Sequence, residues 1–100
     1  MKHRFLARAR EEYLKAVTYY SKIGCGLDVR FTTEIDSVVA LISDKPFRFA
    51  KRMGKLRRAN CKIFPFYVAY YIDEDCIVIV AVGHASRRPN YWKKRISKSQ

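Results

Sequence analysis

The sequence predicts an α+β fold, in which an antiparallel helical hairpin packs on a mainly antiparallel sheet of three to four strands and a short helical turn ends the chain. Apolar residues recur at helical spacing over the first half of the chain, and the period changes to two beyond Pro46. Apolar residues make up 49% of only 100 residues, which is enough for one core. We therefore expect a single domain over residues 1–100, with its core at about 3–95.

Two amphipathic helices are predicted in the first half. The first apolar stripe runs at steps of three and four through Ala9, Tyr13, Ala16, Val17, Tyr20 and Ile23, within a helix from Ala7 to Ile23. Gly24-Cys25-Gly26 interrupts it. The second stripe contains Leu27, Phe31, Ile35, Val38 and Ile42, and Pro46 stops it. Since the connection is short, the helices should be antiparallel.

The strand predictions begin with His3–Leu6, a short segment ahead of the first helix. Residues 58–63 alternate, with Ala59, Cys61 and Ile63 on a dry face and Arg58, Asn60 and Lys62 on a cationic one. Phe64-Pro65 marks a bend, and Phe66–Ile72 is rich in aromatic and β-branched residues, as strands are. We expect meandering antiparallel strands in this half.

The last predicted strand, Cys76–Val82, is apolar at every position. This pattern is typical of a central strand that is covered on both faces. The acidic run Asp73-Glu74-Asp75 separates it from the preceding strand and predicts a hairpin turn.

The three cysteines do not suggest a disulfide framework or a metal site. Cys25, Cys61 and Cys76 are an odd number and lack ligand spacing, so we expect reduced packing residues, no metal and no cofactor. The sequence contains no apparent signal peptide or membrane span. We therefore expect a cytoplasmic protein that does not bind a membrane.

Positive charge is concentrated in the second half of the chain. Residues 1–44 contain 7 basic and 6 acidic side chains, whereas residues 45–100 contain 14 basic and 3 acidic ones. One run has no acid among its members, which are Arg48, Lys51, Arg52, Lys55, Arg57, Arg58 and Lys62. Seven like charges repel one another, so we interpret the run as a binding surface for an anionic partner rather than only a solvated face.

The C-terminal third carries a family resemblance. It contains an "FPY"-like strand at Phe64-Pro65-Phe66, followed by Ala81-Val82 and His84. It ends with Arg87-Arg88-Pro89 and Tyr91-Trp92. Together these residues resemble the ending of the RelE/ParE toxin superfamily. The order of predicted elements over residues 3–95 agrees. The resemblance implies the toxin of a type II toxin–antitoxin pair, similar to ParE-like plasmid stabilisation proteins, with a cognate antitoxin as partner.

The resemblance leaves the target open between two classes. Some members of the superfamily poison DNA gyrase by binding, and others are ribosome-dependent mRNA endoribonucleases. Arginines typical of the nuclease branch align with about Ala85 and Tyr67, so both are absent here. This absence favours a gyrase-binding toxin that is not an enzyme, and a non-toxic nucleic-acid-binding module is a third alternative.

If the chain is a metal-independent nuclease, it needs a base, an acid and cations that stabilise the transition state. The candidates for these roles are His84, Arg87, Arg88, Tyr91, Lys62 and Arg58. Structural roles are the alternative: on that reading His84 bonds a neighbouring carbonyl at a strand end, and Tyr91 and Trp92 close the core. For target or antitoxin binding, the candidates are the seven cations of the basic run with Arg87 and Arg88.

The antitoxin is expected to contribute an acidic, amphipathic segment that is disordered when free and folds on binding. Residues Lys45–Lys62 contain eight cations and no acids. They are interleaved with the apolar residues Phe47, Phe49, Met53 and Leu56. We predict that this segment is the antitoxin surface.

Overall fold

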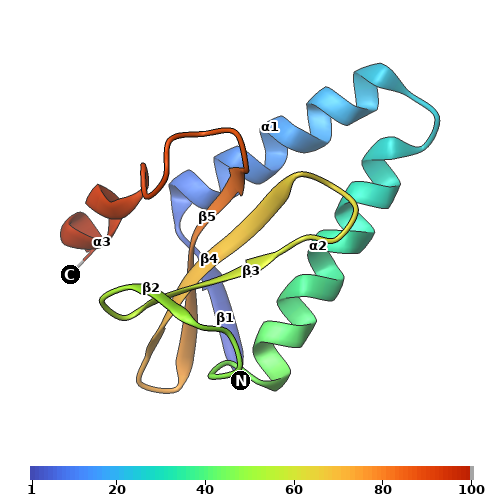
Figure 1. The fold of residues 1–100 in the computed structure, drawn as a ribbon. Helices are drawn as coiled ribbons and strands as arrows, with labels where there is room; N and C mark the ends of the chain where they lie inside the picture. The colour runs from blue at the N-terminus through green and yellow to red at the C-terminus, as the bar shows by residue number, and fades with distance from the viewer. Residues whose placement is uncertain (100) are drawn as a thin grey trace.

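A computed structural model describes residues 1–99 as an α+β fold (Figure 1). Its elements are β1 (Lys2–Phe5), α1 (Ala7–Ile23), α2 (Leu27–Asp44), β2 (Lys51–Met53), β3 (Leu56–Asn60), β4 (Phe66–Asp73), β5 (Cys76–His84) and α3 (Lys93–Ser99). The predicted fold class is confirmed. No helix in residues 1–99 combines the length and the hydropathy that a membrane crossing requires.

The helical hairpin has the predicted bounds. Gly24 and Gly26 have φ values of 90° and 71°, so the loop needs a left-handed backbone at both positions. Each stripe is buried over most of its length, but Ile23 is 51% exposed, because the hairpin tip extends past the sheet (Figure 1). The prediction that Ile23 belongs to the core was wrong.

The sheet has five strands in the order β1-β5-β4-β3-β2. Only the pairing of β1 with β5 is parallel, and the other three pairings are antiparallel. The expected three to four strands missed β2, which forms a short hairpin with β3 through Gly54. Its exposed cations suit an edge strand, because charge discourages pairing with other chains.

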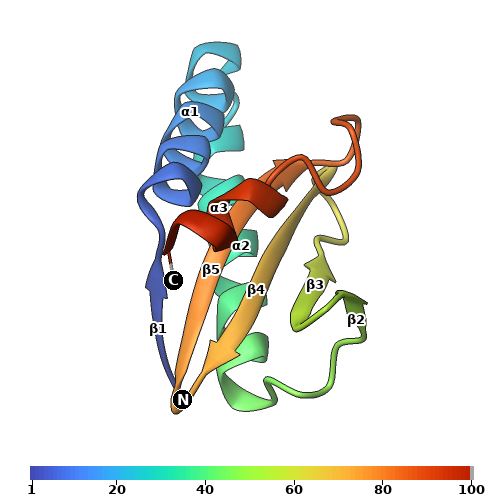
Figure 2. The same ribbon diagram turned by 90° about the vertical axis from the view of Figure 1, so that its left-hand side faces the viewer.

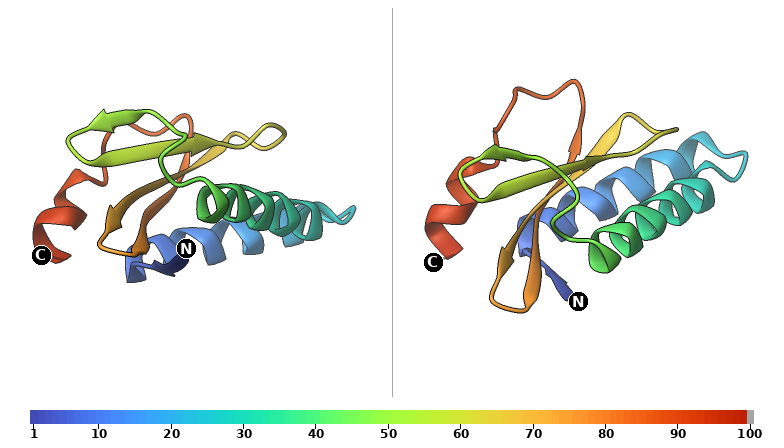
Figure 3. Two further views of the ribbon diagram at one scale, coloured as in Figure 1. Left: turned by 90° about the horizontal axis from the view of Figure 1, so that it is seen from below. Right: turned by 60° about the horizontal axis from the view of Figure 1, so that its bottom comes forward.

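Side chains fill both faces of the sheet. The two helices cover one face, where Phe31, Ile35 and Tyr70 are buried. On the other face, Trp92 is buried with Tyr67 and Tyr71, and partly buried Ile96 of α3 packs beside them. Figures 2 and 3 show the hairpin and α3 at different sides of the strands. Every residue from Ile77 to Val82 is buried, which confirms the doubly covered central strand.

The strand predicted over residues 58–63 ends early, at Asn60. Glu34 of α2 accepts hydrogen bonds from the backbone N–H groups of Lys62, Ile63 and Phe64, at 2.9 to 3.3 Å, and so holds this stretch as a loop. The predicted dry face is therefore wrong at Ile63, which is 71% exposed. Arg57 and Arg58 are both half-buried, so the alternation also shifts within the strand.

Gly83 leaves space for a buried aromatic ring. A Cβ on Gly83 would lie 2.6 Å from Cζ of Tyr67, its partner across β4 and β5. The Tyr67 hydroxyl accepts a hydrogen bond from Trp92 Nε1 at 2.8 Å. Because Gly83 has no side chain, the Tyr67 ring fits against β5, and its hydrogen bond with Trp92 fixes the C-terminal segment on the sheet.

The three thiols are free, as expected, but they do not all pack in the core. Cys61 packs against the helix-side core, and burial, with the nearby Glu34 carboxylate, raises its pKa to about 12. Cys76 is half-buried, whereas Cys25 is exposed at the hairpin tip. The packing prediction was therefore wrong for Cys25.

Candidate functional site

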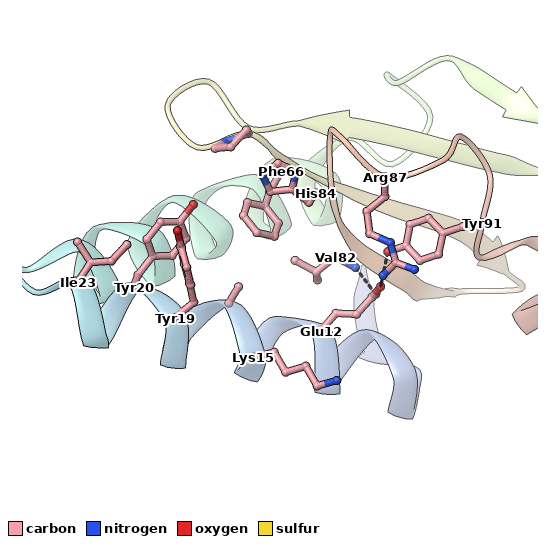
Figure 4. Close-up of a pocket in the computed structure, with 12 residues that line it drawn as sticks. Glu12, Lys15, Tyr19, Tyr20, Ile23, Phe66, Val82, His84, Arg87 and Tyr91 are labelled. Carbon is pink, nitrogen blue, oxygen red and sulfur yellow. Dashed lines mark hydrogen bonds and ion pairs between the residues drawn. The ribbon is translucent and has the colours of Figure 1, made fainter.

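Glu12 of α1 is the centre of the candidate site. Its carboxylate accepts two hydrogen bonds from Arg95, with Nη1 to Oε1 at 2.7 Å and Nη2 to Oε2 at 3.1 Å. The Tyr91 hydroxyl donates to the same carboxylate. Arg87 Nη1 lies 3.9 Å from Oε2. Figure 4 shows Glu12 pointing from α1 toward Arg87 and Tyr91 of the C-terminal segment.

The position of Glu12 follows from the sheet topology. β1 pairs with β5 only from Cys76 to Ile79, and the chain then turns into α1. The next backbone groups of β5 need other partners, because buried polar groups are costly to leave unpaired. Glu12 Oε1 accepts the Val82 N–H at 3.1 Å, and Arg95 Nη1 donates to the Val80 carbonyl at 3.0 Å. The side chains of Glu12 and Arg95 thus hydrogen-bond the backbone of β5 beyond the point where β1 stops pairing with it.

The environment of Glu12 stabilises one protonation state of each neighbour. Burial, followed by the hydrogen bond to Glu12, raises the pKa of Tyr91, so its hydroxyl remains a donor. Burial opposes the charge on Arg95, but its contacts with Glu12 outweigh this effect and raise its pKa. Tyr91 is therefore held as a neutral phenol and Arg95 as a cation.

A groove of about 540 Å³ lies beside this ion pair, between α1 and the ends of β4 and β5 (Figure 4). His84, Arg87 and Tyr91, three of the nuclease candidates, line it together with Glu12. Arg58 and Lys62 do not line it among the described residues. Farther along α1 the lining becomes largely apolar, with Tyr19, Tyr20 and Ile23 of α1 on one side and Phe66 of β4 on the other. The groove therefore has a polar end and an apolar end.

Among the described residues, the His84 ring has no hydrogen bond to a carbonyl, contrary to the structural alternative. Instead, Nδ1 of His84 lies 3.0 Å from the Ser86 backbone nitrogen, which donates to it, and 2.7 Å from the Ser86 hydroxyl. The turn after β5 folds the Ser86 N–H toward the ring, which fixes Nδ1 as an acceptor. The ring also meets Phe66 edge to face, with centroids 5.0 Å apart.

Arg87 and Arg88 are exposed on the segment after β5, as predicted. Arg87 is 55% exposed, and its guanidinium lies 3.9 Å from the centre of the Tyr91 ring. No ion pair of Arg88 is found within residues 1–99. Trp92 closes the sheet core, as predicted, while Tyr91 also anchors the segment through Glu12.

The basic run lies on β2, β3 and the loops beside them. Arg48, Lys51, Arg52, Lys55 and Lys62 are exposed. Four cations of the run lie over aromatic rings: Lys55 over Tyr71 at 4.2 Å, Arg58 over Tyr67 at 3.8 Å, Arg57 over Phe47 at 5.3 Å and Arg48 over Phe49 at 5.9 Å. Arg57 also donates to the Phe49 carbonyl at 2.6 Å. These contacts hold part of the positive surface in place.

The apolar residues within the run mostly belong to the protein's own packing. Leu56 is buried, and Phe49 and Met53 are half-buried against the two cores. Among the four apolar residues of this segment, only Phe47 is largely exposed to solvent, at 65%. Residues Lys45–Lys62 therefore offer charge but little apolar area, which contradicts part of the predicted antitoxin surface.

Sequence reasoning missed the groups that α1 contributes. Glu12 has no local pattern to mark it, because its partners Arg95 and Val82 lie at least 70 residues away in the chain. Arg8 and Lys15 were also overlooked, although they line a cleft with Arg87 and Lys94. Of these residues, only Arg95 carried a sequence signal, because it belongs to the basic and aromatic C-terminal segment.

A helical hairpin on a five-stranded sheet, with a basic aromatic segment anchored across it, defines the RelE/ParE class of small α+β proteins. The family model described as "ParE toxin of type II toxin-antitoxin system, parDE" matches residues 4–89, and the chain belongs to this family. It is 28% identical over 88 residues to "Toxin ParE2" of Mycobacterium tuberculosis in strains CDC 1551 and H37Rv, covering 87% of this chain and 84% of each relative.

A solved structure shares the fold. It is titled "Chromosomal ParDE TA system from P. aeruginosa" and superposes with a TM-score of 0.74 at 16% sequence identity. The match covers 86% of this chain and 97% of that one.

Proposed function

We propose that this ParE-family toxin arrests growth by binding DNA gyrase and that a cognate antitoxin neutralises it. The supporting observation is that groups a nuclease would use are occupied or dispersed. Tyr91 donates its proton to Glu12, and Arg58 lies over Tyr67 outside the groove. Inhibition by binding needs only a surface, which the chain provides. Among the targets known in the superfamily, gyrase is favoured because Tyr67 and Ala85 stand where the nuclease branch typically carries arginines.

One observation favours the second candidate, a ribosome-dependent mRNA endoribonuclease. His84, Arg87 and Tyr91 line the same groove. His84 Nδ1 is held as an acceptor, which leaves Nε2 to carry the ring proton when the imidazole is neutral. The neutral His84 ring therefore supplies a hydrogen-bond donor but not a strong acid, and Tyr91 would first have to leave Glu12.

The antitoxin segment that fits this protein is acidic and amphipathic, and we place its apolar face at the groove beside α1. Exposed Tyr19 and Ile23 form one wall, and Lys15 and Arg87 flank the polar end. An amphipathic helix could bury its apolar side there and direct its carboxylates at the cations. The basic run would speed association, because opposite charges attract over long range.

Growth and two activity assays test the target. Expression of the chain alone should stop bacterial growth, and co-expression of the neighbouring antitoxin should restore it. Purified protein should inhibit gyrase supercoiling and leave transcripts on translating ribosomes intact. Codon-specific cleavage with normal supercoiling would favour the nuclease instead. Unimpaired growth, with soluble protein on a blot, would remove both toxin hypotheses.

Surface plasmon resonance tests the antitoxin site. Ile23→Ala should weaken antitoxin binding about tenfold, since lost apolar burial of this size is worth about 1.5 kcal/mol. Val29→Ala is the matched control, because Val29 is an exposed aliphatic residue of α2, at 64% against 51% for Ile23, that does not line the groove. Equal weakening by both changes would place the antitoxin elsewhere on the hairpin.

A further inference from the structure

A second cleft, of about 810 Å³, lies between the first turns of α1 and the C-terminal segment. Its described lining includes six cations, which are Arg8, Lys15, Arg87, Arg88, Lys94 and Arg95. Arg8 and Lys15 come from α1, and the others come from residues about 70 or more positions later. The concentration of charge is thus created by the fold rather than by a run in the sequence.

Most of this charge is unbalanced. Arg95 is paired with Glu12, and Arg87 lies at the edge of ion-pair distance from the same carboxylate. The other four cations make no ion pair with residues 1–99. Glu11 is the one carboxylate in the described lining, and all four are exposed beside it. The cleft therefore carries a net positive charge that an anionic ligand would balance.

The cleft is already formed and held. The Glu12 carboxylate ties Tyr91 and Arg95 to α1, and the Arg87 guanidinium lies against the Tyr91 ring. A ligand would therefore not have to order the segment that supplies most of the cations, which lowers the entropic cost of binding. The volume lies within the range of about 300–1,000 Å³ that is usual for ligand sites.

The residues that line the cleft favour phosphate groups over an acidic peptide. Leu6 and Ala7 are its only aliphatic members among the described residues, and the Tyr91 ring is covered by Arg87. A peptide would find little apolar area for lasting affinity, whereas phosphate groups are held mainly by charge. The apolar groove on the other side of Arg87 and Tyr91 is the better peptide site.

We propose that the cleft between α1 and the C-terminal segment binds closely spaced phosphate groups, through Arg8, Lys15, Arg88 and Lys94 with Arg87 at its edge. Such groups occur in free polyphosphates and in the backbone of a nucleic acid. The proposal goes beyond gyrase inhibition and does not depend on it, because phosphate binding is measured without a toxic target.

Isothermal titration calorimetry of the full chain at about 0.1 M salt tests the proposal, with tripolyphosphate as the probe. Arg8→Gln with Lys94→Gln should weaken binding at least tenfold. Lys22→Gln with Arg30→Gln is the matched control, since it also removes one lysine and one arginine, both exposed. Lys22 lies about 20 Å along α1 from Arg8 and about 10 Å from Lys15, at least a Debye length of about 10 Å from both, so its loss should change affinity less than twofold.

A single-stranded oligonucleotide as second probe distinguishes the two sources of phosphate. If the cleft holds a nucleic-acid backbone, losing two contacts should flatten the plot of log affinity against log salt by about 1.4. Weakened tripolyphosphate binding with an unchanged oligonucleotide slope would identify free polyphosphate as the ligand. Equal weakening by both double variants, or no tripolyphosphate binding, would overturn the proposal. Tighter binding of an octaglutamate peptide in the cleft would overturn it as well.

Discussion

Neutralising Glu12 should loosen the C-terminal segment from α1 and the sheet. Glu12→Gln keeps the shape of the side chain and an acceptor for the Val82 N–H, but it removes the charge that faces Arg95. Arg95 and Glu12 are only 11% and 15% exposed, so water screens the pair little. Arg95 would then be left as a largely buried cation without a counter-charge.

The magnitude follows from the contacts. Breaking a buried ion pair costs about 3–5 kcal/mol, and this pair is not completely buried. Hydrogen bonds to charged groups contribute about 1.5–3 kcal/mol against about 1 for neutral ones, and glutamine still accepts some of them. We therefore expect Glu12→Gln to lower the free energy of unfolding by about 2–3 kcal/mol.

Urea unfolding followed by the fluorescence of Trp92, the only tryptophan, measures this loss. Glu11→Gln is the matched control, because its exposed carboxylate makes no ion pair within residues 1–96, and it should change stability by less than about 0.5 kcal/mol. A double-mutant cycle with Arg95→Met isolates the pair. A coupling energy below about 0.5 kcal/mol would refute the reasoning, since the pair would then behave like one on the surface.

Three further predictions follow from other contacts. Gly83→Ala should cost about 1–3 kcal/mol in urea unfolding, because its Cβ meets the Tyr67 ring, and a loss under 0.5 kcal/mol would mean that the ring moves aside. Arg87→Ala with Arg88→Ala should abolish growth arrest on induction while costing about 1 kcal/mol or less, and a variant that stays toxic would make both arginines bystanders. Burial opposes ionisation of Glu34, but three backbone N–H donors outweigh it and lower its pKa. Its stabilisation is therefore present above about pH 4.5 and lost as the pH falls through the lowered pKa, so Glu34→Gln should flatten the acid limb of stability against pH. Parallel acid limbs for both proteins would contradict this.

Much of the fold was predictable from local patterns. The helical stripes, the two glycines between them and the apolar run from Cys76 gave the helix bounds and the central strand correctly. The short strand β2 was missed, because three residues, two of them exposed, carry no periodic signal. Residues 61–63 were wrongly predicted as part of a strand, since their alternation is typical of a strand while Glu34, nearly 30 positions earlier, holds them as a loop.

The candidate site was predictable in part. Arg87, Arg88 and Tyr91 were recognised through the family motif, and the structure places Arg87 and Tyr91 beside His84. Arg58 and Lys62 were grouped with them by charge alone, and they lie outside that groove. Residue type shows which chemistry is available, but not which side chains meet.

By itself, the sequence determined the α+β class, the helix bounds, the basic second half and the resemblance to the toxin superfamily, because these depend on periodicity, composition and adjacent motifs. Only the tertiary structure decided that Glu12 joins α1 to the C-terminal segment and that Arg8 and Lys15 share a cleft with Arg88 and Lys94. The physical reason is that β1 stops pairing at Ile79. Beyond Ile79, the backbone of β5 is hydrogen-bonded by Glu12 and Arg95, which come from opposite ends of the chain. No local sequence pattern predicts that these two side chains meet.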